Sequence, residues 1–408
     1  MEPWRIADVR AFVIETTGMG GDYFSREPGH WMVDGCAAGP LSIYPERGSL
    51  RIGAGPYLGG ILVEVEDANG RIGISTGVGG WASCSIVEHS LKPILLAADP
   101  RDLALLWDQM YRSTMVYGRG GIALLAISAV DLALWDLLGL LRSEPVYKMI
   151  GGATKRSLRA YCTGPHPLIY KQLGFVGAKI PLPHGPSEGW QGLKINVETI
   201  RRHRDEIGPD FPLMVDCFMS LDVSYAIELA HATKPYGLYW IEEALPPDNY
   251  KGYRQLRMAA PWVRWVTGEH EYTRYGFLRL IEERAVDVLQ PDLMWVGGLS
   301  EALRIGNLAS AYDIPVVPHA GGTYSYHFAT TQPQTPFVEY CVTSPDGVDI
   351  CPVFGAMFSG EPLPVDGHIT LNDAPGWGMT LDRSVVVVSR AGLDRSTSLD
   401  GPPVASKS

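Results

Sequence analysis

Five polar residues each end a short apolar run in the second half of this 408-residue chain. They are Asp216 in PLMVDC, Glu242 in YWIEE, Glu269 in WVTGE, Asp292 in DVLQPD and His319 in PVVPH. Successive members lie 26, 27, 23 and 27 residues apart, and one strand-plus-helix unit of a barrel takes roughly 25 residues. We therefore expect each to stand at the C-terminal end of a successive strand, on the face where barrel active sites lie. A single such residue would be an ordinary polar strand end.

Three of these residues are carboxylates, and a set of oxygen donors suits a hard divalent cation such as Mg²⁺. Left unpaired, three convergent carboxylates would repel one another, and a cation removes that cost. Glu243 follows Glu242 directly, but in an extended strand it would face the opposite way. The predicted ligands are therefore Asp216, Glu242 and Glu269.

His319 precedes Ala-Gly-Gly, a loop of small residues that leaves its ring uncovered. Asp292, on the preceding strand end, is expected to hold one ring nitrogen and to make the ring more basic. Glu339 ends the next run, FVEYC, and is expected to meet a developing oxyanion from another side, as a hydrogen-bond donor if protonated. Together with a metal, this set suits abstraction of a proton next to a carboxylate.

The elements that must position these residues begin after about residue 150. Eight apolar runs alternate with amphipathic segments such as 223–234, 276–285 and 300–312. This alternation predicts a parallel sheet closed into a (β/α)8-type barrel over residues 151–380. The eight runs are LRAYCTG, GAKIPL, PLMVDC, YWIEE, WVTGE, DVLQPD, PVVPH and FVEYC.

Residues 1–150 predict an α+β capping domain, with strands followed by helices. GGILVEVEDANGRIGISTG reads as a hairpin around Asn69-Gly70, and helices are expected at 85–97, at 102–113 and from Gly121 onward. The longest apolar stretch, GIALLAISAVDLALWDLLGLL, contains Asp131 and Asp136, which favours a buried helix over a membrane span. Residues 381–408 are expected to form a strand that packs back and then a loose tail.

Charge and cysteine content restrict the class of partner. Lys and Arg number 34 against 45 Asp and Glu, for a net charge of −11, which argues against nucleic acid or an anionic membrane as the main partner. The six cysteines form no CxxC pair, and with no hydrophobic leader at the N-terminus they predict reduced thiols in a cytoplasmic enzyme.

With these residues in place, the chain resembles the enolase superfamily and its mandelate racemase-like group, and more closely the L-rhamnonate dehydratases. The resemblance implies Mg²⁺ on the three acids, His319 as the base, and a sugar acid that loses water by syn elimination through an enediolate. It further implies substrate contacts from His30 in GHW, from Arg51, from His270 and from Glu339, and assembly into a homo-oligomer, with an octamer as one form. The matching stretches are GHWMVDG, VDLALWDLLG, GFVGAKIPLPHGP, LMVDCFMSLDV, WIEEALPP, TGEHEYTR, QPDLMWVGG, VVPH, YSYHFATT and PGWGMTL.

Two departures from the family pattern bear on the reaction. Racemases of the group carry two lysines as KxK, whereas this chain has Lys179-Ile180-Pro181, and Ala320-Gly321-Gly322 stands where Gly-Ser-Ser is expected. The missing second lysine argues against a racemase or epimerase. A dehydratase of a related acid (L-mannonate, L-lyxonate or a fuconate) and a catalytically silent barrel remain as alternatives.

Overall fold

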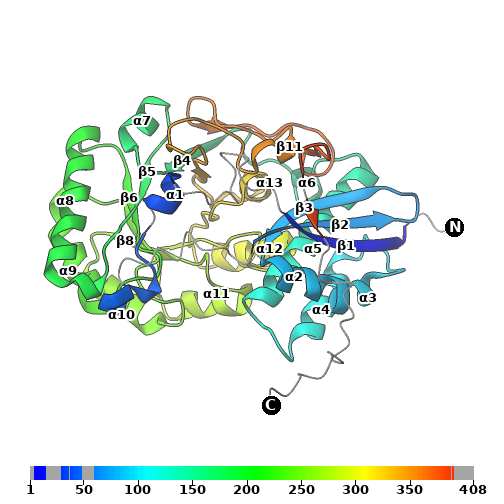
Figure 1. Ribbon diagram of the computed structural model, residues 1–408, viewed down its shortest axis with the longest axis horizontal. Coiled ribbons are helices and arrows are strands. Elements are labelled where there is room, and N and C mark those ends of the chain that lie inside the picture. The colour runs from blue at the N-terminus through cyan, green and yellow to red at the C-terminus, as the bar shows by residue number, and fades with distance from the viewer. Residues whose placement is uncertain (1–3, 15–28, 36, 48–58, 387, 390–408) are drawn as a thin grey trace, which may run out of the picture.

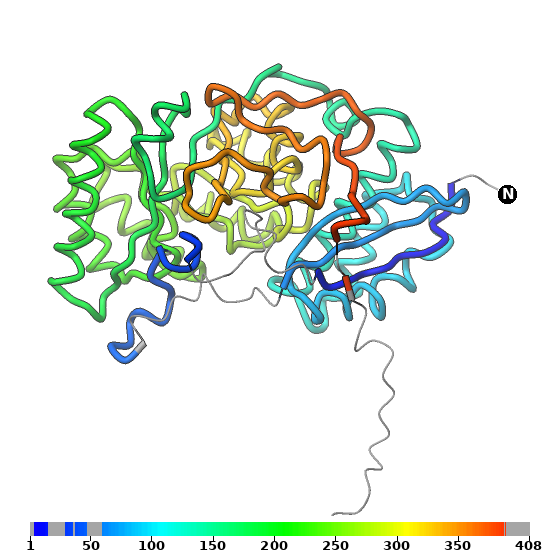
Figure 2. Tube along the Cα trace, turned by 45° about the horizontal axis from the view of Figure 1, so that its top comes forward, coloured from blue at the N-terminus to red at the C-terminus, as the bar shows by residue number. Residues whose placement is uncertain are grey.

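The computed structural model describes residues 4–14, 29–35, 37–47, 59–386 and 388–389 of the chain. Figure 1 shows two regions side by side, a smaller one that carries the N-terminal strand and a larger one in which helices surround a core of strands. Figure 2 shows the late part of the chain, in orange to red, returning from the larger region to the smaller one.

The smaller region is built on a four-stranded sheet. Its strands are β1 (Ile6–Ile14), β2 (Gly60–Asp67), β3 (Ile72–Val78) and β14 (Val388–Ser389), in the order β14-β1-β2-β3. All neighbours are antiparallel. The predicted hairpin between β2 and β3 is confirmed: Gly70 has a φ of +79°, and Asp67 Oδ1 accepts the backbone N–H groups of Asn69 and Arg71, both at 2.8 Å.

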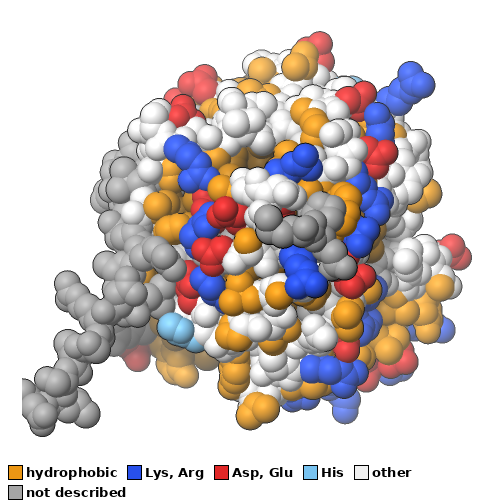
Figure 3. Space-filling view, turned by 90° about the vertical axis from the view of Figure 1, so that its right-hand side faces the viewer, with side chains coloured by type: hydrophobic (Ala, Val, Ile, Leu, Met, Phe, Trp, Pro, Cys, Tyr) orange, Lys and Arg blue, Asp and Glu red, His pale blue; other side chains and the backbone are white. Residues whose placement is uncertain are grey.

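Charged side chains on the outside of this region pair with one another. Arg10 on β1 contacts Asp8 at 3.0 Å, Glu64 at 2.9 Å and Glu66 at 2.6 Å. Figure 3, which views this end of the molecule, shows positive and negative side chains interspersed over the face.

Helices cover the inner face of the sheet. The first predicted helix is present as α2 (Gly80–Ile86), one π-helical turn η4 (Val87–Leu91) and α3 (Lys92–Leu95), and the second as α4 (Leu103–Thr114). The third, α5 (Ile122–Arg142), packs against β2, β3, α4 and α12. By length and composition α5 could cross a membrane, but 78% of its most apolar 18-residue window is buried inside the protein. It is the core helix of this region, as its two aspartates predicted.

The larger region contains seven parallel strands in the order β10-β4-β5-β6-β7-β8-β9. Because the last strand pairs with the first, the sheet curls round on itself. The strands are β4 (Leu158–Thr163), β5 (Ala178–Pro181), β6 (Leu213–Asp216), β7 (Trp240–Glu242), β8 (Arg264–Thr267), β9 (Val288–Leu289) and β10 (Val338–Cys341).

The seventh predicted strand, 315–319, forms only a single bridge, from Val316 to Leu289. It follows β9 through parallel hydrogen bonds, including Val317 N–H to the Leu289 carbonyl at 2.9 Å. Pro315 and Pro318 lack the N–H groups that a continuous ladder needs. The barrel is therefore a modified one, with seven regular strands and one irregular segment among the described residues.

Helices connect the strands and form the outer layer (Figure 1). In chain order they are α7 (Pro167–Gln172), α8 (Gly189–Ile207), α9 (Val223–Thr233), α10 (Tyr250–Ala259), α11 (Thr273–Glu282), α12 (Gly298–Ser310) and α13 (Gly322–Thr331). The remaining elements are short: α1 (Trp31–Asp34), α6 (Val146–Met149), η1 (Pro40–Ile43), η2 (Pro45–Arg47), η5 (Pro186–Glu188), η6 (Lys234–Tyr236), η7 (Gly355–Met357), β11 (Phe358–Ser359), β12 (His368–Ile369) and β13 (Thr380–Leu381).

Side chains from all around the barrel fill its interior. Since side chains alternate along a strand, Glu242 points inward like Trp240 two residues before it. The Trp240 Nε1–H donates to the Glu242 carboxylate at 3.0 Å, which agrees with this placement. The interior cluster consists of Tyr161, Met214, Trp240, Val266, Val288, Val317 and Phe337.

Asp136 joins the two regions through hydrogen bonds of its buried carboxylate, and its substitution is expected to destabilise the protein. One carboxylate oxygen accepts the Ile74 N–H of β3 at 2.9 Å, and the other accepts the Trp377 N–H of the returning segment at 3.0 Å. Asp136→Asn turns one acceptor into a donor that faces an N–H group, so a buried donor loses its partner. We expect the free energy of unfolding to fall by about 1–3 kcal/mol, measured by urea denaturation.

Asp108→Asn is the matched control, because Asp108 is an exposed helical residue with a surface ion pair to Arg112 at 2.7 Å. Such a pair contributes about 0–1 kcal/mol. Equal effects of the two substitutions would show that Asp136 does not tie the regions together.

Candidate active site

The residues predicted at strand ends lie on one rim of the barrel. Asp216 and Glu242 are the last residues of β6 and β7, and Glu269 and Asp292 lie just past the ends of β8 and β9. His319 is the last residue of the irregular segment 315–319. The sequence spacing therefore brings all five to the C-terminal ends of the strands.

His319 and Asp292 form a histidine–carboxylate pair. His319 Nδ1 lies 2.8 Å from Asp292 Oδ2, and the other oxygen of Asp292 accepts the Met294 N–H at 2.7 Å. Held in this way, the ring directs Nε2 toward Glu269 Oε2 at 3.4 Å. Burial alone would lower the pKa of His319, but Glu269, Asp292 and Glu339 raise it well above 6.5. The pair has the geometry of an acid–base group whose Nε2 exchanges a proton with a substrate.

Glu339 does not meet the condition, protonation, under which it was expected to act as a donor. It accepts hydrogen bonds from the Ala320 N–H at 2.8 Å and from the Thr163 hydroxyl, and it forms an ion pair with Lys179 Nζ at 3.0 Å. Burial alone would raise its pKa, but Lys179 and His319 lower it to about 2. Two hydrogen-bond donors and the Lys179 ammonium group favour the carboxylate as an acceptor, and the bond from Ala320 helps to place the 319–320 segment.

Lys179 is a site residue whose role the sequence did not reveal. It is 1% exposed, and its Nζ contacts Glu242, Glu339 and, at 3.8 Å, Asp216. Burial would lower its pKa, but Glu242 and Glu339 raise it well above 10.5. Lys179 is thus a buried counter-ion and not a neutral base. The available signal was a lone lysine inside the apolar run GAKIPL, because a lysine is buried fully only when acids pair with it.

Glu242 is fully buried, and both of its oxygens have donors. Lys179 donates to Oε1, and Trp240 Nε1–H and Gln290 Nε2–H donate to Oε2 at 3.0 and 2.9 Å. Burial raises its pKa to about 7 despite these contacts. The Glu242 carboxylate therefore reaches the rim from inside the barrel.

Asp216 and Glu269 have incomplete hydrogen bonding among the described residues. Glu269 Oε2 is buried and accepts no hydrogen bond, although His319 Nε2 lies 3.4 Å away in an ion pair. Asp216 Oδ1 accepts the Phe218 N–H at 2.9 Å, and Lys179 Nζ lies 3.8 Å from its other oxygen. Burial raises the pKa of both carboxyl groups. A buried carboxylate oxygen that accepts no hydrogen bond is destabilising, and a bound cation would remove that cost. The oxygen donors of Asp216, Glu242 and Glu269 fit Mg²⁺.

Glu243 lies on the same rim, so the expectation that it faces away was wrong. β7 ends at Glu242, and Glu243 has a φ of +46°, a left-handed conformation that turns its side chain out of the strand alternation. Its oxygens contact Thr267 Oγ1 at 3.1 Å and His270 Nδ1 at 2.7 Å. Glu243, Glu269 and His270 form a group whose ligand atoms lie within 4.8 Å of one another.

The predicted substrate contacts fall in different places. His270 stands beside Glu269 on the rim; burial alone would lower its pKa, but Glu243 raises it to about 9. His30 caps α1: its Nδ1 accepts the Met32 N–H at 3.1 Å, so its Nε2–H donates to the Thr343 carbonyl at 2.9 Å. This docks α1 on the loop after β10, and the contact of His30 with a substrate stays a prediction. Arg51 lies outside the described residues.

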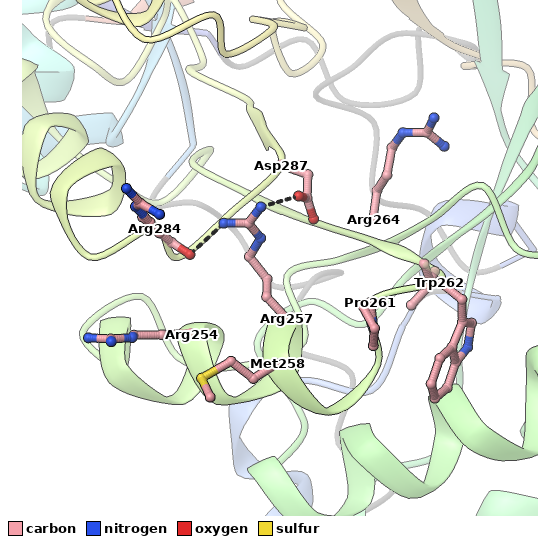
Figure 4. A pocket seen from close by; sticks show the side chains of 9 residues that line it. Arg254, Arg257, Met258, Pro261, Trp262, Arg264, Arg284 and Asp287 are labelled. Carbon is pink, nitrogen blue, oxygen red and sulfur yellow. Dashed lines mark hydrogen bonds and ion pairs between the residues drawn. The ribbon is translucent and has the colours of Figure 1, made fainter.

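A separate pocket of about 600 Å³ lies at the other end of the barrel, where β8 begins with Arg264. Figure 4 shows Arg257 in this pocket reaching Asp287 and the Arg284 carbonyl, at 2.6 and 2.7 Å. It is distant from the acids because the start and the end of a strand lie on opposite rims. The lining residues are Arg254, Arg257, Met258, Pro261, Trp262, Val263, Arg264, Arg284 and Asp287.

Two family descriptions match the chain. Residues 59–151 match the N-terminal domain of mandelate racemase / muconate lactonizing enzyme, and residues 169–385 match the enolase C-terminal domain-like family. The first match falls on the smaller region and the second on the barrel with its returning segment.

Individual proteins resemble the chain over nearly its whole length. L-rhamnonate dehydratase of Saccharopolyspora erythraea is 44% identical over 93% of this chain and 97% of its own. The crystal structure of rhamnonate dehydratase from Gibberella zeae complexed with Mg superposes with a TM-score of 0.90 at 48% identity, covering 95% of this chain and 97% of that one. A racemase from Streptomyces coelicolor A3(2) with bound magnesium is more distant, with a TM-score of 0.75 and 25% identity over 94% of this chain and all of that one.

Proposed function

Because the chain belongs to the enolase superfamily, in the group of mandelate racemase and muconate lactonizing enzyme, we propose that it is a magnesium-dependent L-rhamnonate dehydratase. One observation carries the reaction type: the His319–Asp292 pair faces Glu269 on a rim of buried carboxylates. The substrate is taken from the relatives, two of which are L-rhamnonate dehydratases similar along almost the entire chain.

We propose that Asp216, Glu242 and Glu269 hold the Mg²⁺. The relative from Gibberella zeae is a complex with Mg, and the buried Glu269 oxygen that accepts no hydrogen bond supports a cation here. When bound, Mg²⁺ supplies positive charge that stabilises the anion formed at the substrate carboxylate.

His319 is proposed as both base and acid. Its Nε2 removes the C2 proton of the sugar acid, and the electron pair of that C–H bond forms the enediolate. The C3–O bond then breaks, and the leaving hydroxide takes a proton from the His319 imidazolium and departs as water. The enol that remains gains a proton at C3 and releases the proton of its C2 hydroxyl group to solvent, which gives the ketone, 2-keto-3-deoxy-L-rhamnonate. Proton and hydroxyl thus leave from the same side.

Racemisation would need a second base on the other face of the substrate. Lys179 is held charged between Glu242 and Glu339, and Pro181 stands at the position of the second lysine in racemases. A single usable base favours elimination.

A screen of aldonic acids tests the substrate. We expect the purified protein with Mg²⁺ to convert L-rhamnonate to a keto acid with the highest kcat/KM of the set. EDTA should abolish the reaction, and added Mg²⁺ should restore it. A higher kcat/KM for L-mannonate, L-lyxonate or a fuconate would keep the chemistry and change the substrate. If no aldonic acid of the set gave a keto acid, the dehydratase function would be rejected, and a catalytically silent barrel would remain.

We further propose that the enzyme is cytoplasmic and homo-oligomeric, with an octamer as one form. The family resemblance supports the assembly, and six scattered cysteines without a CxxC pair support a reducing compartment. Light scattering, read in multiples of the 44.6 kDa chain, tests the assembly.

A further inference from the structure

The rim carries a second histidine–carboxylate pair beside His319 and Asp292. His270 Nδ1 lies 2.7 Å from Glu243 Oε2, compared with 2.8 Å between His319 Nδ1 and Asp292 Oδ2. In both pairs the carboxylate is buried and the histidine side chain is partly exposed, 17% for His270 and 14% for His319. The two pairs therefore share one arrangement, in which a buried acid holds the Nδ1 edge of a ring.

The Nε2 atom of His270 is left for something outside the described protein. This Nε2 atom forms no hydrogen bond with the described residues, and it is not one of the fully buried polar atoms that lack a partner. It is therefore in contact with solvent. The opposite edge of the ring faces the acids, since Nδ1 also lies 3.4 Å from Glu269 Oε1. His270 thus stands between the carboxylates and the open side of the rim.

Aromatic side chains flank the His270 ring. Phe218 meets it edge-on at 5.3 Å between ring centroids, and Trp295 lies at 5.1 Å. Trp295 is also 5.5 Å from His319. The same indole thus contacts both histidines, which places the two rings on one wall of the site.

The backbone of Glu243 accepts an unfavourable conformation to form this pair. A φ of +46° in a residue with a Cβ atom is strained, and such strain tends to occur where function requires it. Thr267 Oγ1 donates to the other oxygen of Glu243 at 3.1 Å. Both carboxylate oxygens are therefore used, one to anchor the acid and one to hold His270.

We propose that Glu243 is a positioning residue: it holds His270 so that Nε2 faces the bound sugar acid and hydrogen-bonds one of its oxygens. The proposal rests on the dehydratase function proposed above. It also gives Glu243 a role other than that of a metal ligand, and the Mg²⁺ requirement of the Glu243 variants distinguishes the two roles.

Steady-state kinetics of Glu243→Ala, Glu243→Gln, His270→Ala and the double alanine variant test this role. We expect Glu243→Ala to lower kcat/KM by about 10- to 100-fold, mainly through a higher KM, with the half-saturating Mg²⁺ concentration unchanged. Glu243→Gln keeps an acceptor for the ring and should lose less. The double variant should be no worse than His270→Ala alone, because Glu243 acts through His270.

Glu282→Gln is the control, since Glu282 is an exposed residue at the end of α11. Additive losses in the double variant, or a tenfold higher Mg²⁺ requirement in Glu243→Gln, would overturn the proposal, the latter in favour of a metal ligand.

A crystal structure of Glu243→Ala decides the point without turnover. The His270 ring should rotate away from its present orientation, while the His319 ring stays in place. An unmoved His270 ring would overturn the positioning role even in an active enzyme. A wild-type protein that dehydrates no sugar acid would instead reject the proposed function and leave the ring orientation as the test of Glu243.

Discussion

Substitution of His319 by Asn is expected to lower kcat by about 10²- to 10⁴-fold, the usual contribution of a positioned acid–base group. The reason is that the proposed reaction uses one Nε2 atom twice, to remove the C2 proton and to protonate the departing hydroxyl. Exchange of the C2 proton with D₂O, followed by NMR, should therefore be lost together with dehydration.

His368→Asn is the control for this loss, because His368 is exposed on β12. Asp292→Asn should have a smaller effect than His319→Asn. The asparagine oxygen can still accept a hydrogen bond from Nδ1–H of His319, but it adds no negative charge. If the His319→Asn protein exchanged the C2 proton at the wild-type rate, another base would have to act, and the charged state of Lys179 would need revision.

The second large effect is expected at the metal. Glu269→Gln removes the charge of a predicted ligand whose buried Oε2 accepts no hydrogen bond. Binding of Mg²⁺, measured by calorimetry, should weaken by more than the roughly 10- to 100-fold that follows loss of a residue supporting a ligand. Activity should fall with it and recover in part at high Mg²⁺ concentration.

Glu228→Gln, an exposed change on α9, should leave both Mg²⁺ binding and turnover as in the wild type. Unchanged Mg²⁺ affinity in Glu269→Gln would remove Glu269 from the ligand set. Its buried Oε2, which accepts no hydrogen bond, would then need another explanation, such as an ordered water.

Much of the architecture could be predicted because it depends on local chemistry. The hairpin follows from Asn69-Gly70, where a glycine can adopt a positive φ. The convergence of Asp216, Glu242 and Glu269 follows from the near-constant length of one strand-and-helix unit. Neither inference needs knowledge of the tertiary packing.

What could not be predicted depends on contacts between distant segments. The left-handed turn at Glu243 depends on how the loop after β7 meets Thr267 and His270. The ionisation of Glu339 depends on Lys179 reaching it from another strand. The irregularity of segment 315–319, in contrast, could have been predicted. Pro315 and Pro318 are visible in the sequence and argue against a regular strand.

The strand order β14-β1-β2-β3 has a consequence for biosynthesis. The barrel is inserted, in the topological sense, between β1–β3 and β14 of a single sheet. During translation the N-terminal strands emerge first, but their edge at β1 stays open until residues 388–389 have been made, after every barrel strand. Until then Val13 and Ile14, which pair with Ser389 and Val388, present an unpaired strand edge of the kind that favours wrong association. The nascent chain is thus most exposed to aggregation in the interval between completion of β10 and arrival of β14, and a stop codon in that interval would leave a complete barrel joined to an unfinished sheet.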